Sequence, residues 1–163
     1  MTNTHLILNN IRSTANVGSI FRTADAVGVS KIFITGITPA PVDRFGRDRP
    51  DIAKVSLGAE KSVEWEQKEN IEELIQELKD QNIEIVALEQ SENSIDYKDY
   101  SLDRARDKKP KPFVLILGEE TKGIPEEILK LCDRIIEIPM KGEKESLNVS
   151  VAAGIALSKI TEL

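Results

Sequence analysis

The chain has 163 residues, of which 40% are hydrophobic and 31% charged, and its formal net charge is -6. This length and composition predict one globular domain with its own core, spanning residues 1–163 without an RNA-binding extension at either end, and exclude a disordered or fibrous protein. No apolar run approaches the roughly 20 residues that a membrane span needs. The single cysteine and the single histidine, Cys132 and His5, exclude an internal disulfide and leave too few ligands for a typical zinc site. With no secretion signal in the first residues, we expect a cytoplasmic protein that uses no metal and no membrane.

Short apolar runs alternate with helical patterns along the whole chain. Strands are expected near residues 5–8, 31–35, 62–65, 83–88, 113–118 and 134–138. Such alternation is typical of strand–helix–strand units, so it predicts an α/β fold with a mainly parallel sheet and helices on both faces.

The segment after the first strand, residues 10–28, reads as a helix. Its apolar residues recur at helical spacing, at Val17, Ile20, Phe21 and Ala24. Asn16 is expected to cap this helix, and Gly18 in the first turn would let another backbone or a phosphate come close. Arg22 lies away from the apolar face. On these residues alone, a capped helix with a surface arginine is the simplest interpretation.

Residues 37–61 are expected to lack regular structure because they hold Pro39, Pro41 and Pro50 together with Gly46 and Gly58. Long loops in compact domains are often functional. This one carries five basic residues, Arg44, Arg47, Arg49, Lys54 and Lys61, and four acidic ones, Asp43, Asp48, Asp51 and Glu60. A solvated loop and a nucleic-acid contact both fit this mixture.

The middle of the chain holds one clear helix and one polar stretch. Ile71, Leu74, Ile75 and Leu78 recur at helical spacing, with charged residues on the opposite side, which predicts an ordinary helix covering the sheet. Residues 91–112 are polar and are expected to contain at most a short helical turn.

The segment L-I-L-G-E-E-T-K-G-I-P, residues 115–125, ends an apolar strand. Gly118 and Gly123 have the outer spacing of a phosphate loop, but Ile124 stands where that loop needs a lysine, which excludes a nucleoside triphosphate site. No glycine pattern typical of dinucleotide binding follows any strand. Pro125 fits the first position of a following helix.

A final helix is expected to begin at about Leu147. Its apolar residues leave no wide polar face: Val149, Val151, Ala152, Ala153, Ile155, Ala156, Leu157 and Ile160. Such a helix must be buried on more than one side, which predicts that it packs on its own sheet and on the second subunit of a homodimer. Asn148 and Ser150 stand at its start, where buried polar groups must find partners or serve a function, and capping by Ser146 or Asn148 explains only one of them.

Three of these segments together resemble the SpoU (TrmH-type) RNA ribose methyltransferases of the SPOUT superfamily. The family's first motif matches Asn10, Arg12, Asn16, Gly18, Arg22, Thr23, Ala24 and Gly28; its second matches Gly118, Glu120 and Gly123; its third matches Ile138, Pro139, Met140, Gly142, Ser146, Leu147, Asn148, Val149, Ser150 and Ala152. The three motifs come in the family's order and cover nearly the whole chain.

The resemblance implies a C-terminal trefoil knot over roughly residues 85–155, with the glycines at 118, 123 and 142 letting the backbone pass closely. It also implies a site for S-adenosylmethionine in the knot. Ile138 and Leu147 would form an apolar slot for adenine. Backbone N–H and C=O groups of Leu88, Gly118, Ile138 and Met140 would form hydrogen bonds with its polar edge. The full expected set is Leu88, Gly118, Ile138, Met140, Gly142, Ser146 and Leu147.

The family's catalytic residues map onto Arg22, with Asn16, Glu120, Asn148 and Ser150 around it. The implied reaction methylates a ribose 2'-hydroxyl of transfer or ribosomal RNA, with the arginine contributed across a homodimer interface. Because arginine is a poor base, we expect Arg22 to anchor a phosphate and stabilise negative charge, with a proton-accepting role left open.

Three alternatives stay open. A non-catalytic RNA-binding protein of the same fold fits the acidic charge, because RNA affinity normally depends on Lys and Arg. A related enzyme that methylates a base is also compatible with the motifs. A hydrolase is the least favoured alternative, because a Ser-His-Asp triad needs a histidine and the only one, His5, lies in the first strand.

Overall fold

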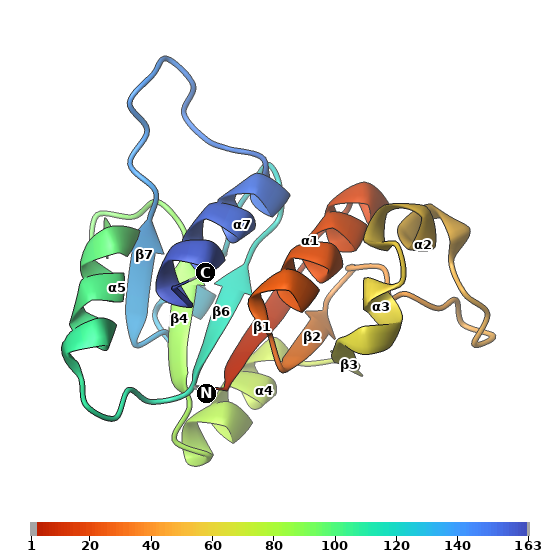
Figure 1. The fold of residues 1–163 in the computed structure, drawn as a ribbon, viewed down its shortest axis with the longest axis horizontal. Helices are drawn as coiled ribbons and strands as arrows, with labels where there is room; N and C mark the ends of the chain where they lie inside the picture. The colour runs from red at the N-terminus through yellow and green to blue at the C-terminus, as the bar shows by residue number, and fades with distance from the viewer. Residues whose placement is uncertain (1–2, 163) are drawn as a thin grey trace.

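The computed structural model describes residues 3–162, which form a parallel sheet with helices on both faces (Figure 1). The strands are β1 Thr4–Asn9, β2 Lys31–Thr35, β3 Glu64–Lys68, β4 Glu84–Leu88, β5 Ile95–Asp96, β6 Phe113–Leu117 and β7 Arg134–Glu137. Their order in the sheet is β3-β2-β1-β6-β4-β7-β5, and every neighbouring pair is parallel. The predicted α/β class is confirmed. All six predicted strands are present, while the two-residue β5 was not predicted.

The helices are α1 Thr14–Val27, α2 Pro50–Ser56, α3 Ala59–Ser62, α4 Ile71–Asp80, α5 Tyr97–Arg106, α6 Glu126–Leu129 and α7 Val149–Ile160. Strand residues alternate between two apolar clusters: Leu6 and Leu8 of β1 join α1, α5 and α7, whereas Ile7 joins α4 and α6. The sheet is therefore covered on both faces, and its central strand β6 is buried over its full length. None of the helices in residues 3–162 has the length and apolar character to cross a membrane.

Two expectations about the connecting segments are wrong. Residues 37–61 were expected to be irregular, yet α2 and α3 lie within or overlap them. Pro50 stands at the start of α2, where a proline's missing N–H costs nothing. Residues 91–112 were expected to hold at most a short turn, yet α5 has 10 residues and buries Tyr100 against the sheet.

The close approach predicted at Gly18 is made by helix α2. A Cβ added at Gly18 would lie 2.8 Å from Cβ of Val55 and 2.9 Å from the carbonyl oxygen of Ile52. Of the two partners left open by the sequence, the described structure places a neighbouring backbone there. The absent side chain therefore allows α1 and α2 to pack in direct contact.

Helix α7 is buried on one side only within this chain. Ala153, Ala156 and Leu157 are fully buried, while Val151 and Ile155 are 49% and 37% exposed. One apolar side of the helix thus faces the sheet and α1, and the other has no cover within residues 3–162.

We expect Gly18→Ala to lower the free energy of unfolding by about 1–3 kcal/mol, because the added methyl group forces α1 away from α2. Urea unfolding followed by circular dichroism measures the change. Gly154→Ala is the matched control, since its Cβ would meet only Cγ2 of Thr23 at 3.9 Å. This control should leave stability unchanged or raise it by about 0.5–1 kcal/mol through helix propensity. Equal stability of wild type and Gly18→Ala would contradict the packing argument.

Candidate functional site

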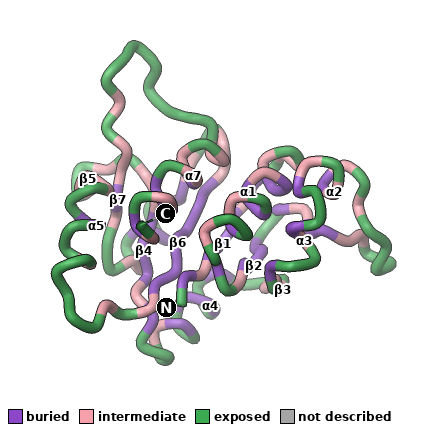
Figure 2. Tube along the Cα trace, viewed as in Figure 1, coloured by how far each residue is buried: buried purple, intermediate pink, exposed green. Residues whose placement is uncertain are grey.

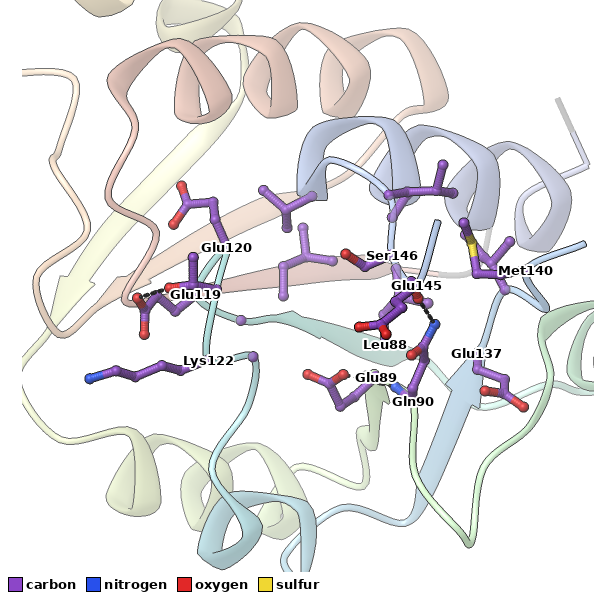
Figure 3. Close-up of a pocket in the computed structure, with 18 residues that line it drawn as sticks. Leu88, Glu89, Gln90, Glu119, Glu120, Lys122, Glu137, Met140, Glu145 and Ser146 are labelled. Carbon is purple, nitrogen blue, oxygen red and sulfur yellow. Dashed lines mark hydrogen bonds between the residues drawn. The ribbon is translucent and has the colours of Figure 1, made fainter. Parts of the chain in front are cut away.

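A cavity of about 300 Å³ opens at the carboxyl ends of β4, β6 and β7 (Figure 3). Three loops that follow these strands and the start of α7 form its walls. The lining residues are Leu88, Glu89, Gln90, Leu117, Gly118, Glu119, Glu120, Thr121, Lys122, Gly123, Glu137, Ile138, Met140, Glu145, Ser146, Leu147, Val149 and Ala152. The carboxyl edge of a parallel sheet is where ligands of α/β proteins generally bind, and this volume suits a small molecule.

Six of the seven residues predicted to hold a cofactor line this cavity, and Gly142 does not. A Cβ added at Gly142 would meet nothing within 4 Å, so the expectation that this glycine permits a close backbone passage is wrong. Gly118 does permit a close backbone passage, whereas Gly123 makes room for a side chain. A Cβ at Gly118 would lie 2.7 Å from the carbonyl carbon of Gly123, and one at Gly123 would collide with the Glu89 carboxylate.

Glu120 joins the cavity to the beginning of helix α1. Its carboxylate accepts hydrogen bonds from the backbone N–H groups of Arg12 at 3.1 Å and Ser13 at 3.0 Å, and from Nδ2 of Asn16 at 3.1 Å. In Figure 3 the Glu120 side chain points toward α1. Negative charge at the amino end of a helix is favourable, because free N–H groups and the positive end of the helix dipole meet there.

The sequence predicted Asn16 as the cap of α1, and this prediction is wrong. The cap is Ser13, whose Oγ accepts a hydrogen bond from the Asn16 N–H at 3.2 Å. The Asn16 side chain is therefore free to bridge two distant segments. It donates to Glu120, and its Oδ1 accepts from Nδ2 of Asn148 at 3.1 Å.

Asn148 continues this chain of hydrogen bonds to helix α7, which it caps as one of the two candidates predicted. Its Oδ1 accepts from the N–H of Ser150 at 2.9 Å and from Oγ of Ser150 at 2.6 Å. Asn148 is exposed and Ser150 half-buried, so the expectation of buried polar groups here is wrong. Four of the five predicted catalytic residues thus form one continuous network, Glu120–Asn16–Asn148–Ser150, beside the cavity.

The hydrogen bonds to Glu120 keep its carboxylate ionised. Burial alone would raise the pKa of Glu120, but the N–H groups of Ser13 and Arg12 and the Asn16 amide outweigh burial and hold the pKa below its ordinary value. At neutral pH the group is a fixed negative charge that accepts hydrogen bonds.

The cavity wall is strongly acidic. Five carboxylates line it, from Glu89, Glu119, Glu120, Glu137 and Glu145, and Lys122 is the one basic residue in the lining. In Figure 3 the Lys122 side chain extends away from Glu89. A ligand with positive charge and an apolar ring would match both these carboxylates and the apolar residues of the wall.

Arg22, the fifth predicted catalytic residue, lies outside this network. It is exposed on α1, does not line the cavity, and forms no hydrogen bond or ion pair with the residues that the structure describes. Its neighbour Thr23 faces Gly154 of α7. Arg22 therefore lies outside the site of its own chain, on a helix that packs against α7.

Glu89 and Gln90, which the sequence analysis did not single out, tie the loops of the cavity together. Oε2 of Glu89 accepts from the N–H of Ile124 at 2.9 Å, and Nε2 of Gln90 donates to the carbonyl oxygen of Glu145 at 2.7 Å. Two polar residues directly after the apolar strand β4 were the signal that could have identified them.

His5 takes no part in the site. It lies in β1 with its ring 6.2 Å from that of Phe33, and its pKa is lowered, chiefly by burial and then by the charge of Lys31. Within residues 3–162 no group of three or more His, Cys, Asp or Glu side chains is arranged to hold a metal ion.

Comparison with known proteins gives one consistent result. The model of the SpoU rRNA Methylase family matches residues 3–158. Two similar proteins, from Staphylococcus haemolyticus and Staphylococcus saprophyticus, are named as TrmH family tRNA/rRNA methyltransferases; they are 33% and 34% identical over 157 residues, which is 96% of this chain and 57% of each relative. The chain thus spans little more than half the length of these relatives.

Solved structures agree with the sequence relatives. An AdoMet-bound rRNA methyltransferase from Sinorhizobium meliloti superposes with a TM-score of 0.83 at 29% identity, covering 98% of this chain and 56% of that one. A TrmH/SpoU tRNA modifying enzyme from A. aeolicus gives a TM-score of 0.81 at 29% identity, covering 99% of this chain and 75% of that one. The trefoil knot stays a prediction from the resemblance.

We expect Glu120→Gln to lower the free energy of unfolding by roughly 1–3 kcal/mol, because the amide presents hydrogens where the carboxylate accepts them. Glu119→Gln is the matched control, since among the described residues the Glu119 carboxylate is held only by Oγ1 of Thr121 and a 3.9 Å ion pair with Arg12. It should cost less than about 0.5 kcal/mol.

The pH dependence of urea unfolding checks the charge of Glu120. Because its pKa is lowered by folding, its contribution is present above the ordinary value of 4.5 and is lost as the pH falls below it. The difference between wild type and Glu120→Gln should therefore shrink at acid pH. A difference that is constant with pH would contradict the assignment of a fixed negative charge.

Proposed function

The chain belongs to the SpoU rRNA methylase family, and from this premise we propose that it transfers a methyl group from S-adenosylmethionine to a ribose 2'-hydroxyl of transfer or ribosomal RNA. The observation that carries the proposal is the network Glu120–Asn16–Asn148–Ser150, which joins the family's three motifs at one edge of a cavity. We place the enzyme in the cytoplasm, where its RNA substrates are made.

The cavity fits the proposed cofactor in the charge and in the apolar character of its lining. S-adenosylmethionine, when bound, supplies an electrophilic methyl group on a positively charged sulfur. The carboxylates of the wall favour that positive charge, and they favour the neutral sulfide product less. Ile138, Leu147 and Leu88 give an apolar surface for adenine, with backbone groups of Gly118 and Met140 beside it.

The residues of the network position the acceptor ribose and carry no proton themselves. Glu120 accepts from Arg12, Ser13 and Asn16, and because these bonds lower its pKa it is a weak proton acceptor. A reaction between two bound groups is accelerated mostly by alignment, and a site fixed by hydrogen bonds from three loops supplies it.

Arg22 is proposed to act in the site of a second subunit. Val151 and Ile155 lie four residues apart on α7 and form one exposed apolar stripe, and Leu147, also exposed, precedes the helix at the cavity wall. A two-fold contact on this stripe would bring Arg22, which lies on the helix packed against α7, close to the partner's cavity. A guanidinium there can hold the phosphate next to the target ribose and stabilise charge developing on its 2'-oxygen.

Arg22→Ala should reduce methyl transfer by at least roughly 10²-fold, the typical effect of removing one group that stabilises transition-state charge. Transfer of labelled methyl groups into total RNA measures the rate, and mass spectrometry of the nucleosides identifies the product. Cofactor affinity, measured by calorimetry, should stay within about twofold, because Arg22 does not line the cavity. Arg106→Ala, an exposed arginine of α5, is the matched control.

The same assay separates the competing functions. Cofactor binding without transfer to any RNA would favour the non-catalytic protein, and a methylated base would favour the base-modifying enzyme. An active Arg22→Ala variant would remove Arg22 from the mechanism. Mixing Arg22→Ala with Ser146→Trp, which fills the cavity, should restore activity, because each mixed dimer carries one intact site.

Val151→Glu should convert the dimer into a monomer, because it places a charge in the middle of the apolar stripe. Light scattering after size-exclusion chromatography gives the mass, and the variant should lose methyl transfer together with the dimer. Leu102→Glu is the matched control, because Leu102 is similarly exposed, at 47%, but lies on α5. A wild-type protein that is monomeric at micromolar concentration would overturn the proposal that Arg22 acts across subunits.

A further inference from the structure

A tight turn projects from the protein between β2 and α2, at residues 41–49. It is closed by an antiparallel bridge between Val42 and Asp48, and the N–H of Asp43 donates to the carbonyl oxygen of Arg47 at 2.8 Å. Gly46 donates to the carbonyl oxygen of Asp43 at 3.0 Å and has φ of 77°, a backbone conformation that favours glycine. This is a hairpin built on a β-turn followed by a left-handed glycine.

Asp43 holds this turn in one conformation. Its Oδ1 accepts from the N–H groups of Phe45 at 2.8 Å and Arg47 at 3.0 Å, and its Oδ2 accepts from Nε of Arg47 at 2.9 Å. Each of these bonds constrains the residues at the tip. A group presented by the tip is therefore ordered before any partner arrives, which lowers the entropic cost of binding.

Phe45 is the residue at the tip, and it is 67% exposed. A single exposed apolar side chain is common and by itself means little. Here, however, two cations flank the ring: the guanidinium carbons of Arg44 and Arg47 lie 4.8 and 5.0 Å from its centre. A rigid turn that presents an aromatic ring among guanidinium groups has no packing role in this chain, because Phe45 belongs to neither apolar cluster.

Ion pairs neutralise most of the basic residues in and beside the turn. Of the five basic residues in this segment, Arg47 pairs with Asp43, Arg49 with Asp51 and Lys61 with Asp48. Arg44, in the turn, and Lys54, in α2, form no ion pair within residues 3–162. Long-range attraction of a polyanion is therefore weak here, and the surface that remains is one aromatic ring with one unpaired guanidinium.

We propose that Phe45, together with Arg44, stacks on an unpaired base of the RNA substrate. The inference rests on the proposed function and deepens it, because it assigns the substrate to RNA with a single-stranded or looped segment near the target ribose. Aromatic rings and guanidinium planes are the groups on which proteins stack splayed-out RNA bases, whereas bases within a duplex cannot be reached in this way.

The position of the turn suits this role. It follows the carboxyl end of β2, and the cavity lies at the carboxyl ends of β4, β6 and β7, so both open on the same edge of the parallel sheet. Figure 2 shows most of the turn exposed, at the end of the molecule beyond α2. An RNA strand lying along this edge can contact both.

A base fits the tip better than a protein partner does. A stable protein interface buries roughly 1,200–2,000 Å² around an apolar centre, whereas the tip offers a single ring next to charged groups. A base needs only one planar face to stack on, and the adjacent phosphates complement Arg44.

Phe45→Ala is the test, with affinity measured for a short single-stranded oligoribonucleotide and for the same strand annealed to its complement. We expect the dissociation constant for the single strand to rise roughly 5- to 100-fold, the range for loss of one stacked base, with little change for the duplex. The loss should persist at high salt, whereas the loss from Arg44→Ala should shrink. Ile37→Ala is the control, because Ile37 is equally exposed, at 66%, in the loop before the turn.

A second variant reports stacking directly and without catalysis. Phe45→Trp, made in a Trp65→Phe background so that one indole remains, should bind the single strand at least as tightly as wild type and show quenched fluorescence when it does. If RNA receives no methyl group but the indole is quenched, the proposed function fails and the stacking proposal stands.

Other outcomes overturn the stacking proposal. They are an unchanged affinity of Phe45→Ala for the single strand, an unquenched indole, or the absence of RNA binding by wild type. A change in oligomeric state of Phe45→Ala would show that Phe45 serves a protein contact, and it would overturn the proposal too.

Discussion

The carboxylate of Glu120 meets the amino end of helix α1, and the geometry of the candidate site depends on this contact. Glu120 lies more than a hundred positions along the chain from Arg12, and it joins the loop after β6 to the loop after β1. The negative charge satisfies N–H groups that have no partner inside the helix, so it is stabilised where it stands. Because Asn16 then bridges Glu120 to the cap of α7, one interaction fixes the mutual position of three segments.

The positions of the acidic residues explain the negative net charge better than the composition alone did. A charge of -6 argues against RNA binding when it is taken as an average over the surface. Part of that charge is placed in the cavity wall, where Glu89, Glu119 and Glu137 complement a positively charged ligand. Other acidic groups neutralise the basic residues of the 41–49 turn. Few unpaired basic groups therefore lie near the turn, and under the proposed function stacking and shape would gain importance in selecting RNA.

Much of the fold could be predicted from the sequence, because strands in a fully covered parallel sheet are apolar runs of recognisable length. Strand β6 is such a run and is buried throughout. Helix α4 was predictable for a different reason, because its apolar residues form one regular buried stripe. Four elements escaped for physical reasons, and one of them, α3, has only four residues. Pro50 was taken as a breaker although it begins α2, α5 buries little besides Tyr100, and β5 has too few residues to show a period.

The sequence predicted most residues of the candidate site, but it did not predict which hydrogen bonds they form. Several polar residues near the start of α1 could have capped it, and the choice of Ser13 over Asn16 depends on Glu120, which only the tertiary fold brings near. Glu89 was missed because its partner is a backbone N–H at Ile124, and a backbone group carries no sequence signal.

The distribution of the functional groups has a consequence for the assembly. Within one chain the hydrogen-bonded network contains four of the five predicted catalytic residues, and Arg22 stays outside it, exposed on the helix that packs against α7. Val151 and Ile155 are exposed to water as long as nothing covers α7. Each Å² of apolar surface left in water costs about 25 cal/mol relative to a buried surface. Under the proposed function, burying that stripe and supplying a cation to the cavity would be the same event. A contact favoured by the hydrophobic effect would complete the site, and a separate turn on the same edge of the sheet would be left free to hold the RNA.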